Sequence, residues 1–197
     1  PFEKCIKQGG AMSVMAAYNS WDGVPCTCNE KLLTDILRNE WGFKGFVVSD
    51  YNSVEGVWEA HRLFDTEWKA QAASLKAGLD VDLPQNSYDD LMIAYKEGWI
   101  DESDIDRALL RVLTAKFSIG LMDKPFADRN EAQSLVRCDE HKQLALEAAR
   151  RSMVLLKNEG VLPFNKKKMK KLAVFGMGAD VFPVGENYSG PVNLSNT

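Results

Sequence analysis

The chain has 197 residues, 45% of them hydrophobic and 26% charged, with a formal net charge of −4. This composition is typical of a folded globular protein and argues against a disordered chain. No apolar run approaches the roughly 18 residues that a membrane-crossing helix needs, and residues 1–4 show no signal-peptide pattern, so no membrane partner is expected and localisation stays open. Because residues 1–120 are acidic overall, they do not predict a nucleic-acid surface.

Three short apolar stretches in the first part of the chain predict buried strands, at residues 11–17, 45–49 and 79–83. Each is followed by a segment with helical periodicity. The predicted helices occupy residues 29–42, 66–77, 87–97 and 103–119. Asn29 is the expected N-cap of the first, and Gly42 ends it, because glycine adopts left-handed backbone angles at low cost. The order of elements is a βα repeat.

The repeat has a measurable period. Tyr18, Asp50 and Asp82 lie at the C-terminal ends of the three predicted strands, at intervals of 32 residues. Eight such units would make about 250 residues, the usual size of a (β/α)8 barrel. An open doubly wound sheet shares this alternation, and the pattern alone does not separate the two folds.

The pattern changes after residue 120. Residues 122–128 are rich in turn formers and lack periodicity, which predicts a linker between domains at about 121–138. Beyond it, residues 139–156 predict a helix, and residues 172–176 predict a strand after a lysine-rich turn. The helix is expected to bury an apolar face made of Leu144, Ala148 and Val154 or Leu155. We therefore expect a second α/β domain to begin at 139–197.

No metal or cofactor is expected. The only close cysteine pair has the spacing Cys-x-Cys, without a nearby histidine to complete a zinc site. The four cysteines are Cys5, Cys26, Cys28 and Cys138. Gly176 and Gly178 could open a dinucleotide fingerprint, but Val181 stands where its third glycine belongs.

Asp50 is the strongest candidate for a catalytic group. It directly follows the buried run 46–48, and polar groups at the C-terminal ends of barrel strands face the catalytic mouth. The next residue, Tyr51, has a ring able to stack on a sugar. The alternative from position alone is that Ser49 or Asp50 caps the following helix. Asp82 has a weaker claim, because a Leu-Pro pair redirects the chain immediately after it.

Five blocks of sequence, in order and spanning most of the chain, resemble glycoside hydrolase family 3. They are residues 17–25, 37–51, 77–84, 151–158 and 187–190, and the Gly-Phe-x-Gly-x-Val-x-Ser-Asp run that ends at Asp50 is the most specific part. The resemblance implies an α/β fold. Residues 1–120 would be the C-terminal part of a (β/α)8 TIM-like barrel, and 139–197 the start of an α/β sandwich domain.

The resemblance also implies an activity and a set of site residues. The activity is that of a retaining, exo-acting β-glycosidase that releases terminal β-D-glucose or xylose from oligosaccharides or glycosides by double displacement. Asp50 would be the nucleophile, Met15 and Tyr18 would line the sugar site, and Tyr51 would lie near the leaving-group sugar. For Met15, plain core packing is the alternative. His61 is assigned a structural hydrogen-bonding role.

Part of the family's machinery has no counterpart in this sequence. The acid/base of the family is usually a Glu of the second domain, beyond residue 197, and a Lys-His pair with sugar-holding Asp and Arg residues belongs to earlier strands. A β-N-acetylglucosaminidase of the same family is a second hypothesis. A third, of another class, is an inactive truncated fragment, because three βα units cannot close a barrel. Its partner would then be the remainder of the enzyme or a homo-oligomer.

Overall fold

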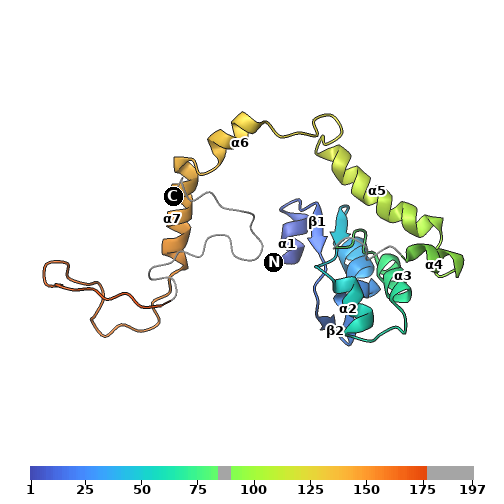
Figure 1. Ribbon diagram of the computed structural model, residues 1–197, viewed down its shortest axis with the longest axis horizontal. Helices are drawn as coiled ribbons and strands as arrows, with labels where there is room; N and C mark the ends of the chain where they lie inside the picture. The colour runs from blue at the N-terminus through green and yellow to red at the C-terminus, as the bar shows by residue number, and fades with distance from the viewer. Residues whose placement is uncertain (84–89, 177–197) are drawn as a thin grey trace. The chain divides into compact units, whose positions relative to one another are not determined.

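The computed structural model describes residues 1–83 and 90–176 (Figure 1). The chain divides into two compact units, Pro1–Arg129 and Asn130–Thr197. This division falls within the segment 121–138 that the sequence predicts as a linker, and the assignment of domains stays a prediction. Among the described residues, no helix is both long and apolar enough to cross a bilayer.

The first unit is built of short strands and helices. In chain order they are α1 (Phe2–Lys7), β1 (Ser13–Met15), β2 (Ser20–Trp21), β3 (Val24–Pro25), the 3-10 helix η1 (Cys26–Cys28), the π-type helix η2 (Lys31–Glu40), β4 (Phe46–Val48), α2 (Ser53–Glu59), α3 (Glu67–Ala77), α4 (Leu91–Lys96) and α5 (Glu102–Ser118). The predicted helices are thus present, with the start of the one at 87–97 outside the described residues.

The strands of the predicted repeat run parallel. β1 pairs with β4, with Met15 opposite Val48, and Val48 forms a single parallel bridge with Val81. The strands predicted at 11–17 and 45–49 are therefore confirmed in shorter form, whereas the third is reduced to one bridge. The ladder stops there because the amide of Leu83 bonds to the hydroxyl of Ser49, at 2.8 Å, and not to a backbone carbonyl.

A small hairpin that the sequence did not predict follows β1. Strands β2 and β3 pair antiparallel, with Trp21 opposite Val24. The two residues between them, Asp22 and Gly23, have φ angles of 53° and 80°. Positive φ at both central positions fits the tight two-residue turn that matches the twist of a hairpin.

Local signals at the helix ends behave as predicted. The side-chain oxygen of Asn29 accepts a hydrogen bond from the Leu32 amide at 3.0 Å, as an N-cap does. The chain leaves η2 through Gly42 and leaves α3 through Gly78, at φ angles of 75° and 114°. These stops return the chain to β4 and to the segment before Val81.

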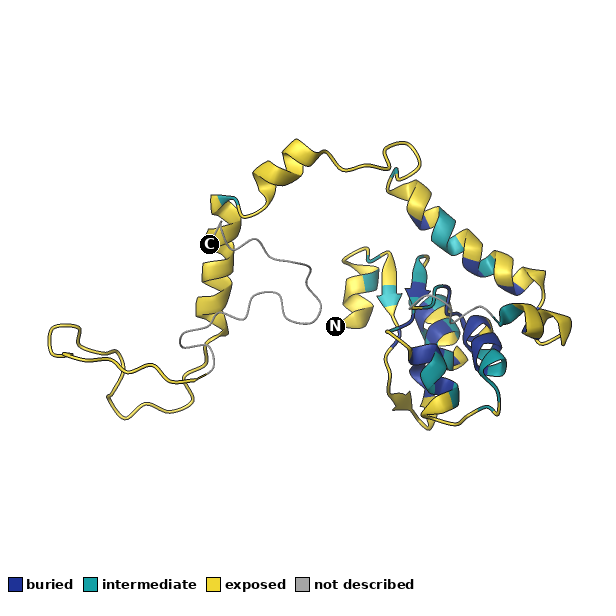
Figure 2. Ribbon diagram, viewed as in Figure 1, coloured by how far each residue is buried: buried dark blue, intermediate teal, exposed yellow. Residues whose placement is uncertain are grey.

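The core of the first unit lies between β4 and its helices (Figure 2). Val47 and Leu79 are fully buried and pack with Leu33 and Leu37 of η2. The chain enters β4 through a close backbone approach, since a Cβ on Gly45 would overlap the carbonyl oxygen of Met12. Glycine is therefore required there on steric grounds.

The second unit holds helix α7 (Asp139–Ser152), and α6 (Arg129–Leu135) spans the division between the units. The helix predicted at 139–156 is confirmed, with an earlier end. Its predicted burial is wrong, because Leu144, Ala148, Val154 and Leu155 are all exposed. The strand predicted at 172–176 is also wrong, since these residues form no strand. Both features need a packing partner, and none of the described residues of this unit is buried.

Candidate active site

Asp50 lies where the chain turns from β4 into α2. Asn52 adopts a left-handed conformation, with φ of 61°, and the Ser53 amide donates to the Asp50 carbonyl at 3.1 Å. The half-buried Asp50 carboxylate accepts from the amide of Tyr51 at 2.7 Å. The alternative in which Ser49 or Asp50 caps α2 is wrong, because the hydrogen bonds of both side chains go to other groups. The carboxylate is thus at the C-terminal edge of the parallel strands.

The structure brings Tyr18 to the segment that carries Asp50. The Tyr18 hydroxyl donates to the backbone carbonyl of Tyr51 at 2.7 Å, and both aromatic side chains are exposed. His61 supports this contact, because its Nε2 lies 3.0 Å from the Tyr18 carbonyl oxygen and its Nδ1 lies 3.4 Å from the hydroxyl of Ser20. The structural role predicted for His61 fits these two contacts.

Ser49 and Asp82 form a second support for Asp50. The buried Ser49 hydroxyl donates to the Asp82 carboxylate at 2.6 Å, while the same hydroxyl accepts from the Leu83 amide at 2.8 Å. Beyond Asp50, the Asn52 amide donates to the Leu83 carbonyl, also at 2.8 Å. Asp82 therefore faces its neighbouring strand end, a role that the sequence did not reveal.

Met15 lies at the end of β1, opposite Val48. It is 58% exposed and lines a cavity of about 430 Å³ whose other walls include Trp21 and the apolar face of η2. Neither Asp50 nor Tyr51 lines this cavity. Met15 is thus brought to the same edge as Asp50, but its surroundings are apolar.

Comparison with known proteins shows which family of proteins this chain resembles. Residues 1–115 match the glycosyl hydrolase family 3 N-terminal domain. The chain belongs to glycoside hydrolase family 3. The sequence blocks around Asp50 thus indicated the correct family.

Relatives within the family are considerably longer than this chain. A putative β-xylosidase from Formosa agariphila is 39% identical over 178 residues, which are 89% of this chain and 24% of that protein. A β-glucosidase from Erythrobacter marinus superposes with a TM-score of 0.75 at 41% identity, over 81% of this chain and 21% of that one. A β-glucosidase from Listeria innocua in complex with gluconolactone gives 0.76 at 34% identity, over 84% and 23%. The chain spans about a quarter of the curated relatives it matches.

In this family 3 chain, Asp80 is the centre of a buried ionic network that the sequence did not predict. Its side chain is 1% exposed, and one carboxylate oxygen accepts from Arg38 at 2.6 Å and from the Val47 amide at 2.8 Å. The other accepts from Arg111 of α5 at 2.8 Å. Burial lowers the pKa of the Arg38 guanidinium, and the Asp80 carboxylate opposes that shift. The network joins η2, β4 and α5.

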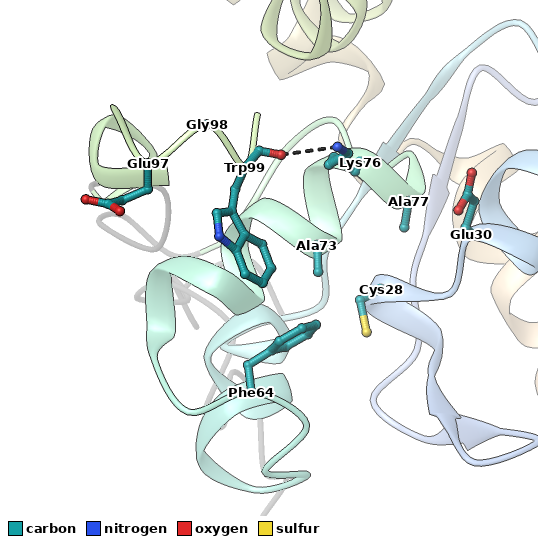
Figure 3. Close-up of a pocket in the computed structure, with 9 residues that line it drawn as sticks. All are labelled: Cys28, Glu30, Phe64, Ala73, Lys76, Ala77, Glu97, Gly98 and Trp99. Atoms are coloured by element: carbon teal, nitrogen blue, oxygen red, sulfur yellow. Dashed lines mark hydrogen bonds between the residues drawn. The ribbon is translucent and has the colours of Figure 1, made fainter. Parts of the chain in front are cut away.

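A second cavity, of about 580 Å³, lies against α3 and the segment after α4 (Figure 3). Phe64 and Trp99 contribute rings to it, but the Lys76 ammonium is engaged with the Trp99 carbonyl oxygen at 3.2 Å, and the Glu97 carboxylate points away from the indole. None of the predicted site residues lines it. The candidate active site is therefore at the strand ends, around Asp50.

Proposed function

We propose that the protein containing this chain is a retaining, exo-acting β-glycosidase that releases terminal glucose or xylose, with Asp50 as its nucleophile. The carrying observation is the placement of the Asp50 carboxylate at the C-terminal edge of parallel strands, oriented by the Tyr51 amide. Membership of family 3 and relatives named β-xylosidase and β-glucosidase support the reaction class.

The reaction would proceed in two displacements. An Asp50 oxygen attacks the anomeric carbon, the bond to the leaving oxygen breaks, and a second carboxyl group protonates that oxygen. The same group then takes a proton from water, which attacks the anomeric carbon and releases Asp50. The two carboxyl groups must lie about 5 Å apart. We assign no residue of this chain to the acid/base role.

The sugar contacts follow from the same edge. The exposed ring of Tyr51 would stack near the leaving-group sugar, Met15 would line the site from the end of β1, and Tyr18 would line it from the segment after β1. Because the Tyr18 hydroxyl is bonded to the Tyr51 carbonyl, Tyr18 would offer its ring, rather than its hydroxyl, to the substrate. The proposal requires no metal or cofactor.

The proposed architecture extends the parallel strands seen here. Residues 1–120 would form the last βα units of a (β/α)8 barrel, and 139–197 the start of an α/β sandwich domain, joined by 121–138. The parallel register of β1, β4 and Val81, at a constant spacing along the chain, supports the barrel.

The test uses the full-length gene product that contains this chain. Nitrophenyl β-xyloside, β-glucoside and β-N-acetylglucosaminide are compared side by side, and we expect hydrolysis of the first two. Preference for the N-acetylglucosaminide would instead favour the second family activity. Asp50→Ala should abolish turnover, whereas Asp106→Ala, which removes an exposed carboxylate of α5, should leave it unchanged. Turnover by the Asp50 variant at the parent rate would overturn the assignment.

A further inference from the structure

Asp50 lies on a two-residue span between two fixed points. On its N-terminal side, Ser49 is fully buried and bonds through its hydroxyl to both Asp82 and the Leu83 amide. On its C-terminal side, the Asn52 amide bonds to the Leu83 carbonyl at 2.8 Å. The strand end before Asp50 and the turn after it are therefore attached to the same neighbouring segment.

Asp82 contacts Ser49 through a single carboxylate oxygen that accepts two hydrogen bonds. One oxygen of Asp82 accepts from the Ser49 hydroxyl at 2.6 Å and from the Leu83 amide at 2.8 Å. The Ser49 amide also donates to the Val81 carbonyl at 2.8 Å. Ser49 is thus held through both its backbone and its hydroxyl, and a change at Asp82 removes the bond from that hydroxyl to Asp82 while the Val81 carbonyl and the Leu83 amide remain as partners of Ser49.

We propose that Ser49 and Asp82 are positioning residues for Asp50: their hydrogen bond fixes the strand end from which the nucleophile attacks. This inference rests on the proposed function. Displacements of about 1 Å from the productive geometry can cost on the order of a hundredfold in rate, so a hydrogen bond that fixes the adjacent residue has a measurable effect. Neither residue touches the substrate in this proposal.

In this proposal Asp82 contributes as a hydrogen-bond acceptor. Asn in its place keeps an oxygen able to accept from the Ser49 hydroxyl and from the Leu83 amide, whereas Ala keeps none. We therefore expect Asp82→Ala to lower kcat by roughly 10- to 100-fold with little change in KM. Asp82→Asn should stay within about threefold of the parent, because its geometry is retained. Ser49→Ala should resemble Asp82→Ala.

The decisive measurement is the rate at which Asp50 becomes glycosylated in the full-length gene product. A 2-fluoro glycoside with a dinitrophenolate leaving group reports this step alone: the bond from Asp50 to the anomeric carbon forms as the bond to dinitrophenolate breaks, and the phenolate carries away the electron pair. The variants are compared with the parent and with Asp106→Ala. Thermal unfolding is recorded for each, so that rate constants are compared among folded proteins.

Two outcomes separate this inference from the proposed function. Slow labelling in Ser49→Ala and Asp82→Ala, with the double variant no slower than either single one and Asp82→Asn near the parent, supports positioning through one shared contact. Labelling at the parent rate in both alanine variants overturns the positioning role while leaving Asp50 as nucleophile. Failure of the proposed function has a different signature, since the label would then be found on another residue or on none.

Discussion

Removing the carboxylate of Asp80 should destabilise the first unit more than any comparable loss of an exposed charge. Asp80→Ala removes the partner of Arg38, whose side chain is only 8% exposed, and also the acceptor of the Val47 amide. Breaking a buried ion pair by deleting one partner costs about 3 to 5 kcal/mol, because the other charge stays buried without compensation. The unpaired Val47 amide places the expected loss toward the upper part of that range.

The assay for this prediction is hydrogen exchange followed by mass spectrometry. It reports local opening free energies in a protein with several units, for which a single unfolding midpoint is poorly defined. A loss of about 4 kcal/mol corresponds to exchange roughly a thousandfold faster in peptides covering β4 and α5. Asp80→Asn should lie between Asp80→Ala and the parent, because it retains an acceptor for Val47 but loses the charge.

A matched control comes from an ion pair of almost the same length on the surface. Asp65 lies 2.7 Å from Lys69, but its side chain is 72% exposed. Surface pairs of this kind contribute little because solvent screens them, so Asp65→Ala should leave the exchange of β4 unchanged. Equal effects of the two substitutions, or an Asp80→Ala protein whose β4 amides exchange at the parent rate, would refute the reasoning from burial.

Three further predictions concern single positions. Gly45→Ala should destabilise the first unit by about 1 to 3 kcal/mol in denaturant unfolding, because the added Cβ meets a backbone carbonyl. Gly56→Ala, inside α2, places its Cβ in open space and should stabilise the unit by about 0.5 to 1 kcal/mol, and the opposite order of stabilities would contradict the packing. Burial raises the pKa of Cys28 to about 11, so iodoacetamide at pH 8 should modify the exposed Cys5 well before Cys28, as peptide mass spectrometry would show. Because the Cys28 thiol ionises at a lower pH in the unfolded chain, its contribution to the free energy of unfolding should be lost between pH 9 and 11. The Asp101 side chain accepts hydrogen bonds from the amides of Ser103 and Asp104 at the start of α5, so Asp101→Ala should lower the stability of the first unit. Because hydrogen bonds lower the pKa of Asp101, this contribution should be present above about pH 4 and lost as the pH falls further, and an equal acid dependence of stability in the parent and the variant would count against the cap.

The helices were predictable because their signals are local. Asn29, Gly42 and Gly78 act through backbone angles and hydrogen bonds within a few residues, and those requirements do not depend on the rest of the fold. The position of Asp50 at a strand end was predictable for a similar reason, since a buried run followed by a polar residue marks the end of a strand.

The contacts that support Asp50 were not predictable from the sequence. Ser49 and Asp82 are 33 residues apart, and so are Val47 and Asp80. Both pairings depend on the register between β4 and the segment 79–83, because a shift by one residue would move the side chains of Asp80 and Asp82 together to the opposite face. The failed strand at 172–176 has a related cause, because a strand exists only where another strand accepts its hydrogen bonds.

The most direct test of the account is the identity of the residue that forms the glycosyl-enzyme intermediate. The full-length gene product is incubated with a dinitrophenyl 2-fluoro-β-xyloside or β-glucoside, digested, and mapped by mass spectrometry. The account predicts one added sugar on the peptide that carries Asp50, and no adduct in Asp50→Ala. A sugar attached to a different carboxylate, or unreduced labelling of the Asp50→Ala protein, would contradict it.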